Sequence, residues 1–359
     1  MTRQFDLGKN HIECVNKTKD LISEIEKNLS EDMSPKEIVQ KYLSKSFGLL
    51  PEESSVYNDY LGTILAIEEI AKNDSLSAYI LIDQIVFREI IKTYTKLNSE
   101  ELLEKGETVG LLCMESGFTG IKNLQTKAVK TAEGWQVTGS KVISNEQIYS
   151  DKFVIFAQDE NNTPRLFIIS EDDIHIEESK KTISSSDIVF NHINLSCNFK
   201  DEENIAVIED NFEKIFSLAR TLIAAASVGI AHSSLIKGIE VAKSVKSSNG
   251  ENLSTSQNIQ FKLADMFSEI EASRMLTYLS ADCIDKNKTN IKYASMAKVK
   301  ASEAASAASM GSLNLLGNIG FIANSDFASL IQRSIDGQVK GGTNRVQESQ
   351  IYEYMLAKK

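Results

Sequence analysis

Prolines are scarce in this chain, and the residues typical of zinc sites are scattered. The sequence has only 3 prolines among 359 residues, so long helices can run without interruption. Its four cysteines include no CxxC pair and its four histidines are equally dispersed: Cys14, Cys113, Cys197, Cys283, His11, His175, His192 and His232. Because these spacings match no usual zinc pattern, we expect no metal site and a protein of a reducing compartment.

Positive charge and long apolar runs are also lacking. Lys and Arg number 39 against 50 Asp and Glu, which gives a formal net charge of -11. Clustered basic residues are needed to bind phosphate backbones, so we expect no nucleic-acid partner. The longest apolar stretch, Leu222 to Ala231, is about half of what a bilayer crossing requires. The N-terminal segment has no apolar core of a signal peptide. We therefore expect a cytoplasmic protein without a membrane partner.

The composition that remains is that of a globular protein, with 42% hydrophobic and 25% charged residues. Residues 1–107 show apolar side chains at helical spacing, for example Tyr60, Ile64, Ile67 and Ala71. The segment 73–75, Asn-Asp-Ser, interrupts this pattern and indicates a turn followed by a new helix N-cap. We interpret residues 1–107 as an N-terminal helical domain.

Residues 108–210 change to short runs rich in Val, Ile and Phe, separated by turn residues. The runs are TVGLLCM, GWQVTGSKVI, KFVIFAQ, RLFIIS and DIVFNHI, with AEGW and DENNTP as hairpin or loop segments. Such runs between turn residues are typical of strands. We expect a central β-barrel-like domain here.

Residues 211–359 return to helical spacing. We expect helices over 212–247, 257–286 and 291–316, and a last helical segment from residue 324 onward. The Ala- and Ser-rich stretch AKVKASEAASAASMGSLNLLG favours close helix packing over a flexible linker. The predicted fold class is therefore α+β, mostly α, with an N-terminal helical domain, a central β-domain and a C-terminal four-helix bundle.

This domain order and several local motifs resemble the acyl-CoA dehydrogenase flavoprotein family along nearly the whole chain. GETVGLLCMESGFTG is similar to the family's flavin loop, and GWQVTGSKVISNEQIYSDKFVIFA to the hairpin that follows it. FSLARTLIAAASVGIA and TSQNIQFKLADM resemble the first two bundle helices. NLLGNIGF resembles a glycine-rich turn, and KGGTNRVQ the terminal Y-E-G-T segment. The motifs occur in family order, although a fold alone does not fix an activity.

The resemblance implies a cofactor, a substrate class and an oligomer. In this family FAD lies between the β-domain and the bundle, with its adenine end touching a neighbouring subunit. An acyl thioester enters beside the flavin ring, where a glutamate removes the α-proton while the β-hydride moves to the flavin. The resemblance thus implies a homodimer or homotetramer that oxidises an acyl thioester of CoA or of a carrier protein.

Cofactor-binding positions are carried over from the family's motifs. In the flavin loop and the following hairpin they are Cys113, Met114, Thr119, Gly120, Ser144 and Asn145. In the bundle they are Lys246, Asn249, Asn314, Gly317, Asn318, Thr343 and Arg345. Met114 stands where the family has a flavin-bonding threonine, and Lys246 stands where an arginine reaches the neighbour's FAD pyrophosphate. The single tryptophan, Trp135, is interpreted as a packing residue.

The catalytic base of the family is missing from both of its known positions. The glutamate of Y-E-G-T aligns with Gly341, and the alternative position in the first bundle helix is Ala219. Neither residue accepts a proton, so ordinary fatty acyl-CoA dehydrogenation is not expected. The backbone N–H of Gly341 is still able to bind the thioester carbonyl, beside Arg220. We also expect the pocket to gain the volume of the missing carboxylate.

Four functions remain open at this point. The first is an FAD-dependent oxidoreductase of specialised metabolism that acts on hydroxy- or amino-acyl thioesters, as in a family branch of polyketide and nonribosomal peptide biosynthesis. The second is a flavin monooxygenase of the same fold. The third is a dehydrogenase with a displaced base: Glu115, Asp336 or Glu348. The fourth is a non-catalytic subunit that binds acyl thioesters or assembles with other proteins. The acyl group, the choice of CoA or carrier protein, and the electron acceptor stay open.

Overall fold

The structure is a computed structural model with side chains. It describes residues 7–28, 33–44, 59–95, 107–115, 124–174, 176–181, 189–200, 204–208, 212–288, 290–315, 317 and 326–357. The helices are α1 (Lys9–Lys27), α2 (Pro35–Ser44), α3 (Tyr60–Asn73), α4 (Ser75–Tyr94), α6 (Phe212–Ser244), α7 (Gln257–Asp285), α8 (Ile291–Leu315), α9 (Asp326–Val339) and α10 (Asn344–Ala357). The strands are β1 (Val109–Leu112), β2 (Lys127–Thr131), β3 (Gly134–Ile143), β4 (Lys152–Gln158), β5 (Pro164–Ser170), β6 (Ile176–Lys181), β7 (Val189–Phe199) and β8 (Asn204–Val207).

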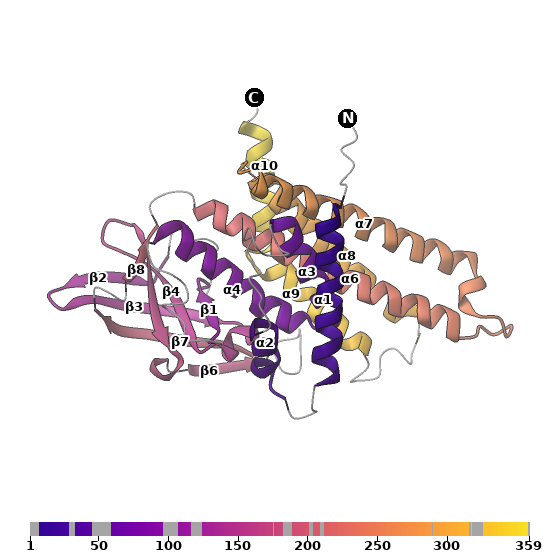
Figure 1. Ribbon diagram of the computed structural model, residues 1–359, viewed down its shortest axis with the longest axis horizontal. Helices are drawn as coiled ribbons and strands as arrows, with labels where there is room; N and C mark the ends of the chain where they lie inside the picture. Colours follow the sequence, from indigo (N-terminus) through magenta and orange to yellow (C-terminus); the bar gives the residue numbers. More distant parts are fainter. Residues whose placement is uncertain are drawn as a thin grey trace. The chain divides into compact units, whose positions relative to one another are not determined.

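This element order confirms the predicted α+β class, with helices before and after a central sheet (Figure 1). The chain packs as two compact units. The first comprises Met1–Ser23, Pro51–Ala78 and Ser217–Lys359, and the second comprises Glu24–Leu50 and Tyr79–Phe216.

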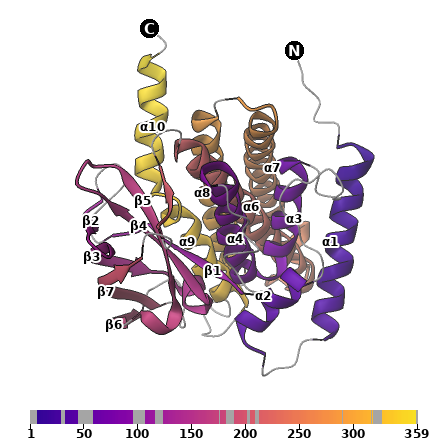
Figure 2. The same cartoon turned by 60° about the vertical axis from the view of Figure 1, so that its left-hand side comes forward.

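The sheet of the second unit is open, which corrects the expected barrel. Its strand order in the described part of the chain is β6-β7-β3-β2-β4-β5-β8, with β1 pairing β4 in parallel. The two terminal strands of this order, β6 and β8, are not paired with each other among the described residues. The neighbouring strands are seen side by side in Figure 2.

The core of the sheet is formed by apolar side chains that alternate with polar ones along the long strands. In the longest ladder, β3 and β7 pair antiparallel from Trp135 opposite Phe199 to Ile143 opposite Asn191. Trp135 is only 9% exposed; its ring packs edge-on against Phe167, with the guanidinium of Arg165 4.2 Å from the ring centre. The structure thus places Trp135 in the core, as a packing residue.

Side chains replace a neighbouring strand at the outer edge of β1. The amide of Gln84 on α4 donates to the Val109 carbonyl at 2.8 Å and accepts from the Val109 N–H at 3.0 Å. The Leu111 N–H donates to Asp83 at 3.3 Å, and its carbonyl accepts from Gln147 at 2.9 Å. Buried backbone groups need hydrogen-bond partners, and these side chains supply them where β1 has no neighbouring strand. The chain then continues from β1 into the segment that resembles the flavin loop.

The first unit is built on long helices packed through small residues. Helices α7 and α8 lie side by side along much of their length (Figure 1). The core residues contributed by α6, α7, α8 and α9 are Ala224, Val228, Ile230, Ala231, Leu235, Ile270, Ala297, Ala301, Ala305, Ala308 and Leu330. The hydroxyls of Ser234 and Ser309 lie 2.8 Å apart across α6 and α8, and a Cβ added at Gly238 would lie 2.4 Å from the Ser312 hydroxyl. The expected close packing of the Ala- and Ser-rich stretch is confirmed.

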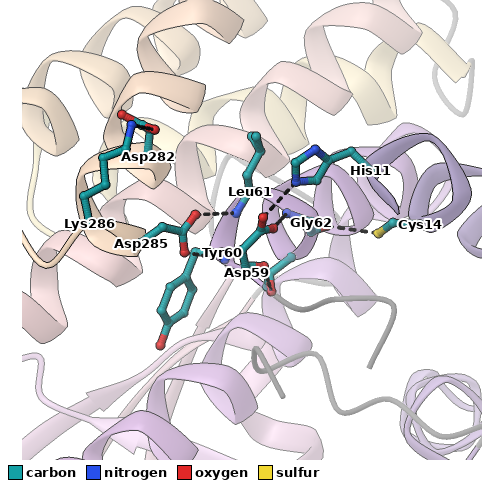
Figure 3. A network of polar contacts seen from close by, with 10 residues as sticks. His11, Cys14, Asp59, Tyr60, Leu61, Gly62, Asp282, Asp285 and Lys286 are labelled. Atoms are coloured by element: carbon teal, nitrogen blue, oxygen red, sulfur yellow. Dashed lines mark hydrogen bonds and ion pairs between the residues drawn. The ribbon is translucent and has the colours of Figure 1, made fainter. Parts of the chain in front are cut away.

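The N-terminus of α3 is capped by carboxylates from two places in the chain (Figure 3). Asp59 accepts the N–H of Gly62 at 2.7 Å, while Asp285 at the end of α7 accepts the N–H of Tyr60 at 2.7 Å. His11 of α1 bonds Asp59 at 2.8 Å. Since the first N–H groups of a helix have no partner within it, these carboxylates stabilise α3 and attach it to α1 and α7.

Helix α6 is the one element in the described part of the chain long and apolar enough to span a membrane by length and composition. Its apolar window is 83% buried within the structure. Burial of this extent is typical of the central helix of a folded core, which passes the same length test.

Candidate active site

The turn between α9 and α10 carries Gly341, the residue that the sequence comparison aligns with the family's glutamate. Gly341 has φ +65 and Gly342 has φ +90, both in the left-handed region that favours glycine. Thr343 follows and caps α10, because its hydroxyl accepts the N–H of Val346 at 3.4 Å and its carbonyl accepts that of Gln347 at 3.1 Å. Two glycines in this conformation fold the chain sharply between two helices.

Arg220 lies against this turn, so the structure brings together the two residues predicted for catalysis. Its guanidinium Nε donates to the Gly341 carbonyl at 3.3 Å, and Gln347 of α10 donates to the same oxygen at 3.2 Å. Arg220 is 5% exposed. In the described part of the chain, no hydrogen bond uses the N–H of Gly341. That N–H is therefore able to donate to a ligand oxygen.

The space beside Gly341 is partly filled, which corrects the expectation that the missing carboxylate leaves extra volume. A Cβ built on Gly341 would lie 2.8 Å from Ile223 Cδ1 and 3.5 Å from Arg220 Cγ. Ile223 is 5% exposed and lies one helical turn after Arg220 on α6. An apolar side chain and the stem of Arg220 thus stand where a base would begin.

Sequence reasoning missed a second buried cation at this turn, Lys298 of α8. Its ammonium donates to the carbonyls of Gln338 and Gly342 at 2.9 and 2.8 Å and to Asn344 Oδ1 at 2.8 Å. Burial, with a smaller contribution from the charge of Arg220, lowers the pKa of Lys298 to about 7. The three oxygen acceptors match the ammonium form, because only the ammonium has three N–H groups to donate.

The predicted flavin segments in the second unit are joined through Gln147. Its side chain accepts the Ser144 N–H at 3.2 Å and donates to the Leu111 carbonyl at 2.9 Å, so Ser144 lies near the end of β1. The Met114 carbonyl accepts the N–H of Val142 at 3.0 Å. Burial raises the pKa of the Cys113 thiol to about 11, which keeps it protonated at neutral pH. This segment offers backbone atoms and a neutral thiol.

Glu115, one of the candidate displaced bases, is engaged in a buried ion pair with Lys141. It accepts from Lys141 Nζ at 2.7 Å, from the Thr126 hydroxyl at 2.6 Å and from the Gln125 N–H at 2.6 Å. Burial alone would raise the pKa of Glu115, but the hydrogen bonds from Lys141 and its neighbours lower it below its ordinary value. A carboxylate held this way is a poor proton acceptor.

We expect Glu115→Ala to lower the free energy of unfolding by about 3–5 kcal/mol, because it leaves the buried Lys141 charge without its partner. The side chains of Lys141 and Glu115 are 0% and 2% exposed. The double variant Glu115→Ala/Lys141→Met should recover part of the loss. Urea unfolding monitored by circular dichroism measures the free energy of unfolding of the single and the double variant. Equal losses in the single and double variants would contradict a buried ion pair.

The other two candidate bases lie on α9 and α10. Glu348 pairs with Arg345 at 2.6 Å on α10, and the Arg345 side chain is 89% exposed. Asp336 lies on α9, one turn before its end, and its carbonyl accepts the N–H of Lys340 at 3.0 Å. No hydrogen bond within the described residues joins either carboxylate to Gly341.

The remaining predicted cofactor residues lie at exposed ends of the bundle. Lys246 and Asn249 belong to the α6–α7 connection, where Asn249 Oδ1 accepts the Glu251 N–H at 3.2 Å. Asn314 is exposed at the end of α8, and Gly317, with φ +59, has no atom within 4 Å of a built Cβ. No hydrogen bond of the described residues connects these positions with Gly341. Thr119, Gly120 and Asn318 lie outside the described residues, as does the side chain of Asn145.

Known proteins resemble this chain in sequence. A family model described as "Acyl-CoA dehydrogenase, C-terminal domain" matches residues 210–356. The rat protein "Short-chain specific acyl-CoA dehydrogenase, mitochondrial" is 25% identical over 333 residues, which cover 86% of this chain and 79% of the rat protein.

Solved structures share the fold along nearly the full chain. Butyryl-CoA dehydrogenase from Megasphaera elsdenii superposes with a TM-score of 0.83 at 23% identity, covering 98% of this chain and 100% of that one. The structure titled "Prolyl Acyl Carrier Protein Oxidase AnaB" superposes with a TM-score of 0.80 at 19% identity, covering 99% and 100%. At these identities the structures establish the fold alone.

Proposed function

We propose that this member of the acyl-CoA dehydrogenase family is an FAD-dependent oxidoreductase that oxidises a β-hydroxyl of an acyl thioester without a glutamate base. The observation that carries this proposal is the Gly341 turn. It keeps an N–H for the thioester carbonyl while a carboxylate is absent from both Gly341 and Ala219.

The residues of the chain divide the chemistry between binding and polarisation. The Gly341 N–H donates to the thioester carbonyl. Arg220 and Gln347 donate to the backbone carbonyl of Gly341, so that the turn keeps its orientation. Ile223 lies beside this position and limits the water that reaches it. The site thus positions a thioester and polarises its carbonyl, but it supplies no carboxylate for the α-proton.

A β-hydroxyl thioester fits such a site because its oxidation leaves the α-carbon untouched. Bound FAD would accept the hydride that leaves the β-carbon. The hydroxyl group releases its proton to water, and the β-carbon becomes a carbonyl. A hydroxyl proton is far more readily exchanged with water than an α C–H proton, so the loss of the glutamate is tolerated.

The exposed polar residues of the bundle fit FAD bound across subunits. Lys246 offers a positive charge for a pyrophosphate, and the open backbone at Gly317 lets a cofactor approach closely. Arg345 and Asn249 are exposed and suited to polar contacts with an adenosine. Cys113, Met114, Thr119, Gly120, Ser144 and Asn145 are the residues that we propose for the flavin end. Asn314, Asn318 and Thr343 complete the proposed set.

We further propose that the thioester is carried by an acyl carrier protein of specialised metabolism. The segment SKVISNEQIYSDKFVIFA resembles this branch of the family without gaps, and a protein whose structure is described as a prolyl acyl carrier protein oxidase shares the fold. CoA carries the same phosphopantetheine arm, so CoA thioesters should act as weaker substrates.

Anaerobic mixing of the FAD-loaded protein with defined thioesters tests this function. The probes are 3-hydroxypropionyl, glyceryl and seryl thioesters on a carrier protein and on CoA, with propionyl thioesters as matched controls. We expect flavin bleaching with hydroxylated probes and none with propionyl. Bleaching by neither set, or a purified protein without yellow colour, would favour a subunit that binds without chemistry.

A homodimer or homotetramer is the expected state of the FAD-loaded protein. Lys246 and Asn249 lie on a connection with no hydrogen bond to the Gly341 turn among the described residues, as expected of residues that serve a neighbour's cofactor. Large apolar side chains are also exposed on α7 and α10: Phe261 at 60%, Phe267 at 52%, Tyr352 at 60% and Met355 at 63%. Analytical ultracentrifugation should show no monomer at micromolar concentration. A monomer with full FAD occupancy would refute the shared site.

A further inference from the structure

We propose that Lys298 is the positioning residue of the Gly341 turn. Its ammonium holds the end of α9 and the start of α10 at a fixed separation. The last step, presentation of the Gly341 N–H to a thioester carbonyl, rests on the proposed function. The positioning of the turn itself does not.

One side chain reaches three consecutive parts of this corner. The acceptors of Lys298 are Gln338 in the last turn of α9, Gly342 in the turn and Asn344 at the first position of α10, at 2.9, 2.8 and 2.8 Å. Asn344 in turn bonds the Ser302 hydroxyl of α8 at 3.1 Å. The ammonium therefore brackets Gly341 on both sides from a single rigid helix.

The position of Lys298 on a buried helix fixes its ammonium in place. It is 0% exposed and lies two turns into α8, where the nearby residues Ala297 and Ala301 are both fully buried in the bundle core. A helix packed through such small side chains has little freedom to shift. The turn, in contrast, has two glycines, which have the greatest backbone freedom of all residues. The ammonium thus restricts the backbone of the turn, which its two glycines would otherwise leave the most flexible.

The buried charge is difficult to explain by packing alone. Desolvation of an ammonium is costly, and an apolar side chain of similar length would fill the same space with less penalty. The helix-end carbonyls give the reason for a cation, because the last carbonyls of α9 have no partner within the helix and carry its partial negative charge. Arg220 holds the Gly341 carbonyl from α6 in the same way, at 3.3 Å.

Amide hydrogen exchange tests the positioning directly, without any substrate. The reporters are the N–H groups of Lys340, Val346 and Gln347, which bond Asp336 O, Thr343 Oγ1 and Thr343 O. We expect Lys298→Met to speed exchange at these amides by about tenfold or more, with the middle of α6 and α8 unchanged. Asn344→Ala, which removes one acceptor and is the milder change, should show a smaller effect at the same amides.

Ser309→Ala is the matched control on the same helix. The Ser309 hydroxyl is buried and bonds Ser234 and the Leu330 carbonyl, away from the turn. It should lower overall stability without a selective change at the reporters. Unchanged exchange at the turn in both Lys298→Met and Asn344→Ala would overturn the proposal. So would an increase spread evenly over α6, α8 and α10.

A binding comparison links the turn to the thioester. Acetyl-CoA has no β-carbon to oxidise, and S-ethyl-CoA is its thioether without the carbonyl. Titration calorimetry of the FAD-loaded wild type should show about threefold to tenfold tighter binding of acetyl-CoA, the worth of one hydrogen bond. Asn344→Ala should reduce that preference and Ser309→Ala should keep it. A wild type without any preference counts against the proposed role of Gly341, whereas the exchange experiment alone decides the role of Lys298.

Discussion

Butyryl- through palmitoyl-CoA are expected to bleach the flavin of this protein slowly or not at all. The expected rate is about 10²–10⁴-fold below that of a family member that keeps its glutamate, since this is the usual worth of general base catalysis. Gly341 and Ala219 leave both family positions without a carboxylate. Glu115, which belongs to the segment that resembles the flavin loop, is engaged by Lys141, Thr126 and Gln125.

Stopped-flow absorbance at the flavin band, under anaerobic conditions, measures this rate. A glutamate-containing acyl-CoA dehydrogenase in the same cuvette is the positive control. Fast bleaching by any saturated acyl-CoA would show that a base has been overlooked, with Asp336 and Glu348 as the first residues to substitute.

A glutamate introduced at position 341 should restore α,β-dehydrogenation, provided that the neighbouring Ile223 is made smaller. Gly341→Glu alone would place its Cβ 2.8 Å from Ile223 Cδ1. It would also place a non-glycine residue at φ +65, at a cost of roughly 1–2 kcal/mol. Ile223→Val removes the offending methyl at about 0.5–1.5 kcal/mol. We therefore expect the double variant Gly341→Glu/Ile223→Val to bleach with butyryl-CoA at least about 10²-fold faster than wild type, and Gly341→Glu alone to gain less.

The pH dependence of the double variant identifies the new group as the base. Only the ionised carboxylate accepts a proton, so bleaching should rise with pH through the pKa of the introduced carboxyl group. Burial would raise that pKa above about 4.3, whereas the charge of Arg220 would lower it. Gly341→Gln/Ile223→Val is the control and should stay inactive. A folded, FAD-loaded double variant that never bleaches would show that the site has diverged beyond its base, towards oxygen chemistry or binding alone.

Much of the fold was predictable because its elements follow simple apolar patterns. β3 and β4 have the bounds of the runs GWQVTGSKVI and KFVIFAQ, and α7 and α8 end within one residue of the predicted positions. The Asp74 cap was also predicted: its carboxylate accepts the Ser77 N–H at 3.1 Å, and its own N–H donates to the Ile70 carbonyl at 2.8 Å. The last helical segment is two helices, because Gly341 and Gly342 interrupt it.

The strands that were missed are either poor in apolar residues or very short. β2 reads KAVKT and buries only Ala128, β6 reads IEESKK, and β8 has four residues. Their place in the sheet depends on long-range pairing with β3, β7 and β5, which the local pattern does not encode. The division into three domains, 1–107, 108–210 and 211–359, stays a prediction.

The site was predictable only where a motif marked it. The motif led to Gly341 and Arg220, which the structure brings together at 3.3 Å. Lys298 and Ile223 carried no such signal, because a lysine on an amphipathic helix usually lies in solvent and an isoleucine usually fills a core. Only the packing of α8 and α6 against the turn gives these two residues their roles.

The most direct test of the central claim is the isotope effect on flavin bleaching by 3-hydroxypropionyl thioester in single turnover. Deuterium at C3 reports the hydride that leaves the β-carbon, and deuterium at C2 reports abstraction of the α-proton. The account predicts a slower reaction with C3-deuterated substrate and an unchanged rate with C2-deuterated substrate. A slower reaction with C2-deuterated substrate would mean that the protein removes the α-proton. A base at a position other than 341 or 219 would then accept that proton.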